Sequence, residues 1–470
     1  MKAGFSAACI TPPVGKEIPG LFERRIAQGV HDDLLARAVV ADDGGKTIAL
    51  VQTDTIALPE NVVTRARALA HCLCGITESN CLIAATHTHS GGPTFGGFLS
   101  KADEGYCTFV AERVASAIAE AYRARRPVLV GTGAAAAEAV AFNRRFVMRD
   151  GLQRTHPGKM NADIVAPAGP EDPTVTVVGF CEPKTFSPVG CIVNFACHAT
   201  HMNGYLYSAD YVRWVVDTLR SVYGQDFGVV YLNGACGDVT QMDNRSPRPG
   251  EFGEYWCERT GRVVGGAALQ AMGRLDYFSR AAVDRRTATV SARIRKSSSE
   301  SLRAARALLR KKMMTSDDVE TIYANELLEV EAMRRESPEI RLKITGVRIA
   351  DTLLWGVPAE FFQQFALDVR AASPFPHTCC IELANGYNGY ICTKEAFAGG
   401  GYEVRTARSS LLEPGTGEDI VRTAKTLSRR LYSEAGTETQ ALPGRRAWPV
   451  VHDTALDGIQ QINRKGRRSE

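Results

Sequence analysis

The sequence contains no stretch of about 18 consecutive apolar residues, which is the length that a membrane-spanning helix requires. It also has almost no excess of charge, because 56 Lys and Arg residues face 52 Asp and Glu residues and leave a net charge of +4 over 470 residues. So small an excess excludes the basic surface that attracts nucleic acids or anionic membranes. We therefore expect a small-molecule partner, no nucleic acid and no stable membrane insertion, and the sequence leaves a homo-oligomer open.

Cysteine pairs at metal-binding or redox spacing are absent as well. The chain has 13 cysteines, an odd number, and none of them form a Cys-x-x-Cys motif. Because disulfide frameworks and zinc ribbons use regular spacings, we interpret these side chains as mostly reduced thiols. The amino terminus reaches Pro12 and Pro13 before an apolar run of signal-peptide length accumulates. Together these features predict a cytoplasmic location.

What the sequence does contain is an alternation of strand and helix patterns. With 44% hydrophobic and 23% charged residues, its composition is that of a folded globular protein. Apolar runs at 46–52 and 80–85 flank a helical pattern at 61–74, which is the order of a βαβ unit. We expect an α/β fold with a mixed β-sheet core flanked by helices. Further expected elements are helices at 102–125 and 360–370 and strands at 174–180, 191–196, 228–232, 340–349 and 352–357.

The expected domain organisation is simple. No internal repeat or low-complexity linker is visible, so we expect one domain at 1–435 and a polar, basic carboxy-terminal segment at 436–470. Residues 297–337 combine dense charge with Leu and Ala at helical spacing. A basic nucleic-acid arm and a solvated helical hairpin both fit this segment, and its interleaved acids and bases favour the hairpin.

The most specific motif is ATHTHSGGP at residues 85–93, directly after an expected buried strand. In an extended segment His87 and His89 would point to the same side, because side chains alternate along a strand, and neutral imidazoles are good zinc ligands. A histidine pair satisfied by hydrogen bonds in a loop is the competing interpretation. The glycines that follow favour a ligand site, since glycine lets the backbone approach a ligand closely.

Two further polar side chains follow expected strands. His198 and His201 come after the apolar run that ends at Phe195, and Glu360 ends the segment GVPAE. A core histidine is the alternative for His198, and His201 is more simply a neighbour. Glu360 also suits an ordinary helix amino terminus, where a carboxylate interacts well with the helix dipole.

Three glycine-containing segments are candidates for lining a pocket. Residues 233–240 (NGACGDVT) can present backbone donors to a ligand or form a tight turn. Residues 385–390 and 399–403 are rich in Gly and Tyr, unlike a packed core. Tyrosine hydroxyls in these segments can ligate a metal or hold an oxyanion.

Taken in chain order, these segments resemble the neutral/alkaline ceramidase family, zinc-dependent amidohydrolases that cleave the N-acyl bond of ceramide. The resemblance covers residues 3–405. ATHTHSGGP is its specific motif, whereas each of the other segments is a weak match alone and supports the resemblance because the segments occur in the same order as in the family. The resembling segments are AGFSAACITPP, HDDLLARAVV, ATHTHSGGP, FNR at 142–144, GPEDPTVTVV, NFACHAT, NGACGDVT, GVPAE and the two Tyr-rich segments.

The resemblance implies a zinc ion bound by His87, His198, Glu360 and Tyr390. A site with two imidazoles, a carboxylate and a phenol leaves a position for water, as in catalytic zinc sites. We expect carboxylates to orient the two imidazoles, and Asp33, Asp54 and Asp238 are available for this.

The resemblance also implies four catalytic residues. His89 lies beside the reacting carbonyl in the family, Arg144 and Tyr402 are further donors to an oxyanion, and Thr240 stands where the family has a catalytic serine. Two neighbouring positions depart from the family pattern, because Ala359 replaces a glycine and Arg145 a serine. The family's carboxy-terminal immunoglobulin-like domain is not expected here, since the chain is shorter by about that domain.

The function predicted from these residues is zinc-dependent hydrolysis of an N-acyl amide by zinc-activated water. We expect a soluble small substrate, because the chain shows no signal peptide and no conspicuous apolar anchor. Two alternatives stay open: a true ceramidase acting on N-acylsphingosine, and a catalytically inactive, zinc-dependent ligand-binding protein.

Overall fold

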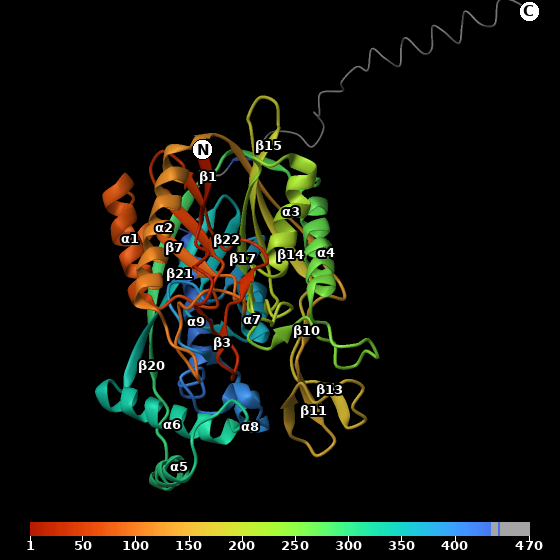
Figure 1. Ribbon diagram of the computed structural model, residues 1–470. Coiled ribbons are helices and arrows are strands. Elements are labelled where there is room, and N and C mark those ends of the chain that lie inside the picture. Colours follow the sequence, from red (N-terminus) through yellow and green to blue (C-terminus); the bar gives the residue numbers. More distant parts are fainter. Residues whose placement is uncertain (434–439, 442–470) are drawn as a thin grey trace, which may run out of the picture.

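Three of the β-sheets in the computed structural model, which describes residues 1–433 and 440–441, repeat one topology (Figure 1). The first repeat consists of β1 (Lys2–Cys9), β5 (Leu35–Asp42), β6 (Thr47–Thr53), α1 (Glu60–Cys74), β7 (Cys81–Ala85) and α2 (Glu104–Arg123). The second consists of β9 (Leu129–Ala136), β14 (Thr174–Cys181), β15 (Pro188–Phe195), α3 (Tyr211–Tyr223), β17 (Gly228–Asn233) and α4 (Glu254–Met272). The third consists of β20 (Val283–Arg293), β21 (Glu339–Ile349), β22 (Thr352–Gly356), α7 (Gln363–Ala372), β24 (His377–Ile381) and α9 (Thr416–Ser433).

Each repeat pairs its four strands in chain order. The first and second strands are antiparallel, and so are the second and third. The fourth strand is parallel to the third and is reached through a helix. The parallel pairs β6–β7, β15–β17 and β22–β24 therefore each have two carboxyl ends at one edge, the place where open α/β sheets bind ligands.

The three sheets share one core and cover their outer faces separately. Inward side chains of all three meet in a single cluster that includes Leu50, Ile192 and Leu354. The outer faces are covered by α1 and α2, by α3 and α4, and by α7 and α9, respectively. Because both faces of each sheet are buried, a strand such as β6 is buried almost throughout and has a central run of four apolar residues, without the alternation of a half-exposed strand.

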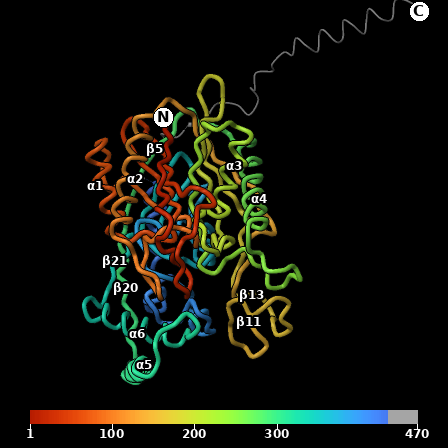
Figure 2. The backbone as a smooth tube through the Cα atoms, viewed as in Figure 1, coloured from red at the N-terminus to blue at the C-terminus, as the bar shows by residue number. Residues whose placement is uncertain are grey.

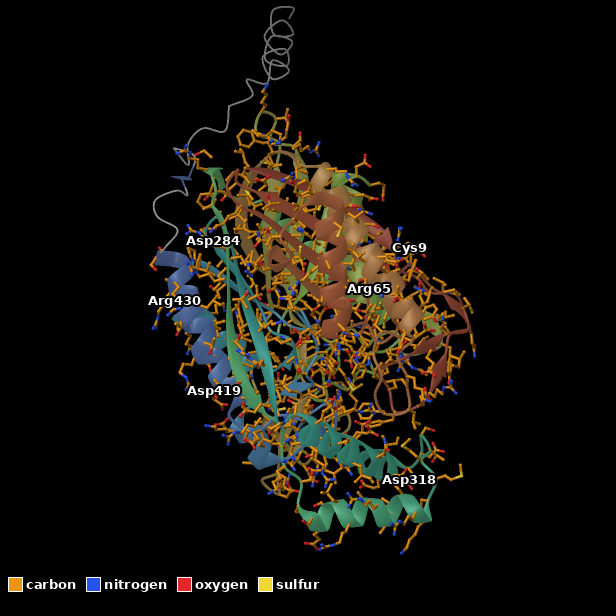
Figure 3. All side chains as sticks on the ribbon, turned by 90° about the vertical axis from the view of Figure 1, so that its left-hand side faces the viewer. Cys9, Arg65, Asp284, Asp318, Asp419 and Arg430 are labelled. Atoms are coloured by element: carbon orange, nitrogen blue, oxygen red, sulfur yellow. The ribbon has the colours of Figure 1, made fainter. Side chains whose placement is uncertain are left out.

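The remaining elements lie mostly in connections between the strands and helices of a single repeat. They are β2 (Glu17–Ile18), β3 (Arg25–Ile26), β4 (Gly29–Val30), β8 (Arg126–Pro127), β10 (Phe142–Asn143), β11 (Arg145–Met148), β12 (Gln153–Thr155), β13 (Ile164–Pro167), β16 (Leu206–Tyr207), β18 (Val239–Thr240), β19 (Tyr277–Arg280), α5 (Ser299–Lys311), α6 (Val319–Glu336), β23 (Glu360–Phe361), β25 (Tyr390–Ile391), α8 (Lys394–Gly399), β26 (Gln440–Ala441) and the short 3-10 helices Glu78–Asn80 and Tyr402–Val404. Figure 2 shows α5, α6, β11 and β13 gathered at one end of the molecule. Figure 3, turned by 90°, shows α9 with Asp419 and Arg430 on the outer side of β20 and the α5–α6 pair again at that end.

The structure confirms the predicted α/β class and its mixed sheets flanked by helices. The expected strands at 46–52 and 80–85 and the helices at 61–74 and 102–125 correspond to β6, β7, α1 and α2 within two residues. The charged segment 297–337 forms a helical pair, α5 and α6, as the interleaved charges favoured. The predicted carboxy-terminal segment 436–470 falls outside the described residues except for β26.

One predicted element is wrong at the position that matters most. We expected a helix from Glu360 to Arg370, but the helix begins only at Gln363, and Glu360 lies in β23, paired in parallel register with Tyr390 of β25. The backbone N–H of Glu360 donates to the carbonyl of Gly389 at 3.0 Å. This long-range pairing has no local sequence signal, so Glu360 is held by a strand and not by a helix dipole.

The close contact between α3 and α4 yields a test of the packing. A Cβ atom on Gly261 of α4 would overlap the carbonyl of Tyr211 and the side chain of Trp214 on α3, whereas a Cβ on Gly266 meets open space. We expect Gly261→Ala to lower the free energy of unfolding by about 1–3 kcal/mol through overpacking. Gly266→Ala, the matched control in the same helix, should raise it by about 0.5–1 kcal/mol. Equal effects in denaturant titrations would contradict the α3–α4 arrangement.

Candidate functional site

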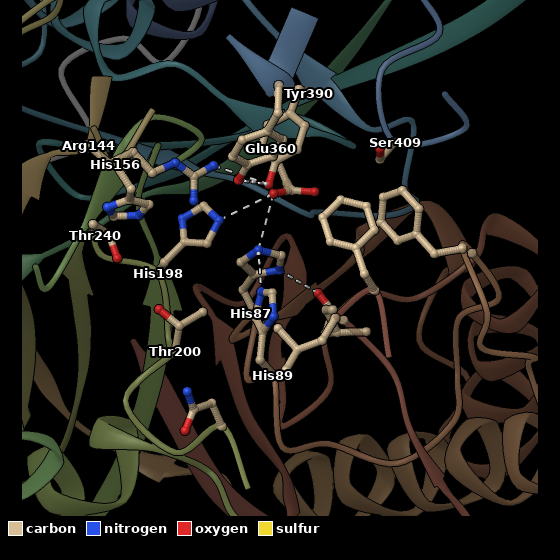
Figure 4. A pocket seen from close by; sticks show the side chains of 18 of the residues that line it. His87, His89, Arg144, His156, His198, Thr200, Thr240, Glu360, Tyr390 and Ser409 are labelled. Atoms are coloured by element: carbon tan, nitrogen blue, oxygen red, sulfur yellow. Dashed lines mark hydrogen bonds and ion pairs between the residues drawn. The ribbon is translucent and has the colours of Figure 1, made fainter. Parts of the chain in front are cut away.

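The carboxyl ends of strands from all three repeats bring one side chain each to a common point. His87 follows β7, His198 follows β15, and Glu360 follows β22. The Oε2 atom of Glu360 lies 3.2 Å from Nε2 of His87 and 3.4 Å from Nε2 of His198, and all three residues are buried (Figure 4). The structure thus brings together three of the four residues that the resemblance assigned to zinc.

Backbone carbonyls fix the protonation pattern of the two imidazoles. His87 Nδ1 lies 2.8 Å from the carbonyl oxygen of Ile56, and His198 Nδ1 lies 2.7 Å from that of Cys236. Because a carbonyl only accepts hydrogen bonds, each Nδ1 carries the proton and each Nε2 faces Glu360. The predicted carboxylate partners are therefore wrong: Asp33 and Asp54 bond elsewhere, and Asp238 accepts from the backbone N–H of Gln363.

This arrangement leaves acceptor atoms facing one another. Burial lowers the pKa of His198 to about 3, assisted by the charge of Arg144, so its Nε2 is a lone-pair acceptor. Nε2 of His198 and Oε2 of Glu360 have no hydrogen-bond partner. Burial also lowers the pKa of His87, but the Glu360 carboxylate outweighs it and raises the pKa overall. A proton on His87 satisfies one contact only, whereas a metal ion satisfies both imidazoles and the carboxylate, so the donor set fits a metal.

His89 belongs to the same cluster, but not for the predicted reason. His87 has a φ of +67°, so the segment is not extended and strand alternation does not align the two rings. They still converge, with their Nε2 atoms 3.4 Å apart, and one ring nitrogen each of His87, His89 and His198 lies within 4.8 Å of the others. Three histidines can therefore contribute to a metal site.

The two predicted tyrosines lie beside Arg144. The buried Arg144 guanidinium donates to the Tyr390 hydroxyl at 3.1 Å and to the Gly237 carbonyl at 2.7 Å. The Tyr390 and Tyr402 hydroxyl oxygens are 3.3 Å apart. Arg144 also pairs with Glu403, which Arg145 binds on its other oxygen at 2.5 Å. Arg145 thus helps to hold the carboxylate next to Tyr402.

Thr240 is present in the site but engaged with a neighbour. Its hydroxyl donates to Oε1 of Gln241 at 2.6 Å, and the hydroxyl of Thr200 donates to the same oxygen at 2.8 Å. His201 lies outside the site, because its ring contacts Asp210 and Thr260 at 2.7 and 2.9 Å. His201 is therefore the structural neighbour that the sequence suggested.

Several residues of the site were missed at the level of sequence. The Tyr387 hydroxyl donates to Oε1 of Glu360 at 2.8 Å, and His156 lines the cavity with its pKa lowered to about 4 by burial and by Arg144. Only Tyr387 had a signal, since it lies in the Tyr-rich segment 385–390. His156 lies on the 137–173 connection, where no pattern marked it.

A cavity of about 330 Å³ contains the cluster and has two chemically different sides. Figure 4 shows Thr200, Thr240, Arg144 and His156 on one side of the imidazoles and Ser409 on the other. Besides the imidazoles, Arg144, Glu360 and the tyrosines, the polar lining residues are Thr200, Asn203, Thr240, Gln241 and Ser409. The apolar lining residues include Leu21, Phe22, Ile56, Phe95 and Phe98. The cavity therefore suits a ligand with one polar and one hydrocarbon part.

A buried carboxylate, Glu382, braces the loops that carry two of the cluster residues. Its Oε2 atom accepts from the backbone N–H groups of both Cys236, at 2.9 Å, and Phe361, at 3.2 Å. The Cys236 carbonyl orients His198, and Phe361 is adjacent to Glu360. Glu382 thus connects the supports of both side chains without touching either.

Comparisons with known proteins show which solved structures have the same fold as this chain. No family model and no curated protein sequence matches the chain. The structure is similar to the crystal structure of neutral ceramidase from Pseudomonas aeruginosa, with a TM-score of 0.69 and 20% identity over 94% of this chain and 76% of that chain. It is equally similar to a ceramidase complexed with C2, with a TM-score of 0.69, 21% identity and the same coverage. The chain therefore has the neutral ceramidase fold, as its motifs predicted.

The lengths and compositions of the helices are relevant to the prediction that the protein does not insert into a membrane. Among the described residues, no helix combines the length and the apolar character needed to cross a membrane.

The bracing role of Glu382 can be tested through metal affinity. Glu382→Gln replaces one acceptor oxygen by an amide NH₂ and should weaken metal binding about 10-fold to 100-fold, as expected when the support of a ligand is lost. Competition with a chromophoric chelator measures this. Glu138→Gln, at an exposed loop position, is the control and should leave affinity unchanged. If Glu382→Gln bound the metal with wild-type affinity, Glu382 would not be needed to support the metal ligands.

Proposed function

We propose that the protein is a zinc-dependent hydrolase that cleaves the N-acyl amide bond of a small soluble substrate. The observation that carries this proposal is the convergence of His87 Nε2, His198 Nε2 and Glu360 Oε2 in a buried cluster, in which the Nε2 atom of His198 and the Oε2 atom of Glu360 have no hydrogen-bond partner. The fold shared with neutral ceramidase supports the same chemistry.

The proposed ligands favour zinc used in catalysis. Neutral imidazoles and a carboxylate are typical of catalytic zinc sites, whereas structural zinc sites are commonly closed by cysteines. The 13 cysteines of the chain supply none of the converging atoms. Bound zinc polarises a carbonyl and lowers the pKa of its water to about 7, which supplies a nucleophile at neutral pH.

The chain's own residues provide the remaining chemistry. Burial raises the pKa of the Tyr402 phenol, so its hydroxyl keeps its proton and can donate to an oxyanion. Arg144 contributes a fixed positive charge to the same side of the cavity. Burial and the neighbouring His87 and His198 hold the pKa of His89 well below its usual range, so this imidazole is neutral and able to donate or accept one hydrogen bond beside the carbonyl.

The substrate class follows from the cavity and not from the fold. One side of the cavity is polar, with Thr200 and Gln241, and the other is aromatic, with Phe22 and Phe98. This pairing favours an acylated polar amine. A true ceramidase and a zinc-dependent binding protein without turnover are the alternatives, and the engagement of Thr240 with Gln241 favours the latter if a free hydroxyl is required.

Removal of one imidazole tests the metal assignment. His198→Ala should abolish both stoichiometric zinc, measured by atomic emission, and hydrolysis, because the remaining ligands cannot hold the ion. His71→Ala, on the exposed face of α1, should retain both. Full zinc content and turnover in His198→Ala would show that the metal site lies elsewhere.

Tyr402 tests oxyanion stabilisation separately from metal binding. Tyr402→Phe removes only a hydroxyl and should lower kcat about 100-fold with zinc content unchanged, as for a donor used mainly in the transition state. Tyr255→Phe, at an exposed position, is the control. A normal kcat in Tyr402→Phe would limit Tyr402 to packing.

A substrate series decides between the three functions. We would measure kcat/KM for acetyl through palmitoyl amides of one amine and for ceramide. The highest values for an acyl group no longer than hexanoyl would support the proposal. A rise of several powers of ten toward palmitoyl would favour ceramide, because each buried CH₂ contributes about 0.8 kcal/mol. Binding without turnover of any member would favour the binding protein.

A further inference from the structure

The helical pair α5–α6 occupies the same topological position as two segments that form the cavity. Each repeat connects its first and second strands by a long segment, which covers residues 10–34, 137–173 and 294–338, respectively. The first segment supplies Leu21 and Phe22 to the cavity lining, and the second supplies Arg144 and His156. The third contains α5 and α6, and its contacts lead to the same cavity.

Helix α6 reaches the cavity through an aromatic contact. The ring of Tyr323 lies 5.8 Å from that of Phe22 and 6.3 Å from that of Phe98, and these two rings lie 4.7 Å apart. Phe22 and Phe98 line the cavity, and the buried Tyr323 packs behind them. Arg405 covers the far face of this group, with its guanidinium 3.7 Å from the centre of the Tyr323 ring. We call Phe22, Phe98 and Tyr323 the aromatic wall.

Glu326, one turn further along α6, fixes the backbone of two lining loops. Its Oε1 accepts from the backbone N–H of Phe98 at 3.1 Å, and its Oε2 accepts from the backbone N–H of Arg408 at 3.0 Å. The Arg408 guanidinium donates to both oxygens, at 2.9 and 2.5 Å. The carboxylate is 1% exposed, so all four bonds are made away from water. Charge-assisted bonds of this kind are roughly twice as strong as neutral ones.

The backbone of Phe98 needs this support. Its φ is +55°, which a bulky residue adopts only when its surroundings impose it. Glu326 holds the N–H of that residue, and Arg408 precedes Ser409, which also lines the cavity. The position of Phe98 relative to Phe22 therefore depends on a side chain of α6.

We propose that α6 sets the acyl-group specificity of the cavity: the aromatic wall receives the hydrocarbon part of the N-acyl group, and Glu326 is the positioning residue that holds this wall. This inference rests on the proposed amide hydrolysis. The Thr200 and Gln241 side then receives the polar amine. Glu326 touches neither the metal-binding cluster nor the substrate, so it acts on chain-length selection and not on the chemical step.

The test compares chain-length dependence in matched variants of the zinc-loaded protein. In the wild type, kcat/KM should rise about fourfold per CH₂ from acetyl to hexanoyl amides as the chain covers the wall. Glu326→Gln should lose most of this rise while kcat for the acetyl amide and zinc content stay within about twofold. Glu329→Gln, on the exposed face of the same helix, is the control and should keep the wild-type slope. A merely structural role would lower all substrates equally, and such a uniform loss would overturn the proposal.

A second variant and a second measurement keep the inference testable on its own. Tyr323→Leu removes one ring of the wall and should reduce the slope in the same way, even if Glu326→Gln fails to fold. Calorimetric binding of acetate through hexanoate to each zinc-loaded protein requires no turnover. If no amide is cleaved but the carboxylates show a slope that both variants lose, the wall stands and the proposed hydrolysis fails. If amides are cleaved and both variants keep the slope, the hydrolysis stands and the wall is wrong.

Discussion

The site depends on one electrostatic constraint: the Nε2 atoms of His87 and His198 are buried within 3.4 Å of a single carboxylate oxygen, Oε2 of Glu360. The Nδ1–H group of each imidazole donates to a backbone carbonyl. Neither ring can therefore turn this N–H toward Glu360 without losing its hydrogen bond to the carbonyl. Burying such acceptors unpaired costs free energy, and a shared cation offsets the cost. The supports around the cluster, from the Cys236 carbonyl to the Tyr387 hydroxyl, hold the acceptor atoms in an arrangement that a bound cation would stabilise.

The threefold repetition of one topology explains how such a cluster forms from distant segments. Each repeat ends its parallel strand pair at the same edge, and the shared core of the three sheets aligns these edges. One acceptor from each repeat therefore reaches the centre, and the long connections after the first strands close around it. The sequence has no internal repeat, because a topology constrains only where apolar runs and turns fall and leaves the side chains free to differ.

Local patterns predicted those parts of the fold whose causes are local. β6 and β7 were visible as apolar runs because both faces of their sheet are buried, and α1 ended at a glycine with a positive φ, Gly75. His87, His198 and Arg144 were identified through motifs, which carry information from relatives that periodicity lacks. The strand at Glu360, the left-handed backbone of His87 and the brace at Glu382 each depend on partners far away in the chain, so no local pattern could show them.

The buried carboxylates around the cavity differ in how their charge is balanced, and this difference identifies the one that is free for a metal. Glu403 lies between Arg144 and Arg145, and Glu326 is paired with Arg408, so both have permanent cations. Glu382 has no ion pair in the described part of the chain, and burial raises its pKa to about 7. Its carboxyl group is therefore close to neutral and is held by neutral hydrogen-bond donors. Glu360 is different, because burial alone would raise its pKa but the positive charge of protonated His87 beside it holds the pKa well below the usual range. Among the described residues it keeps its charge without an arginine or lysine partner. A divalent metal that displaced the proton of His87 would place this charged carboxylate beside two neutral imidazole nitrogens, which is a donor set typical of metal sites.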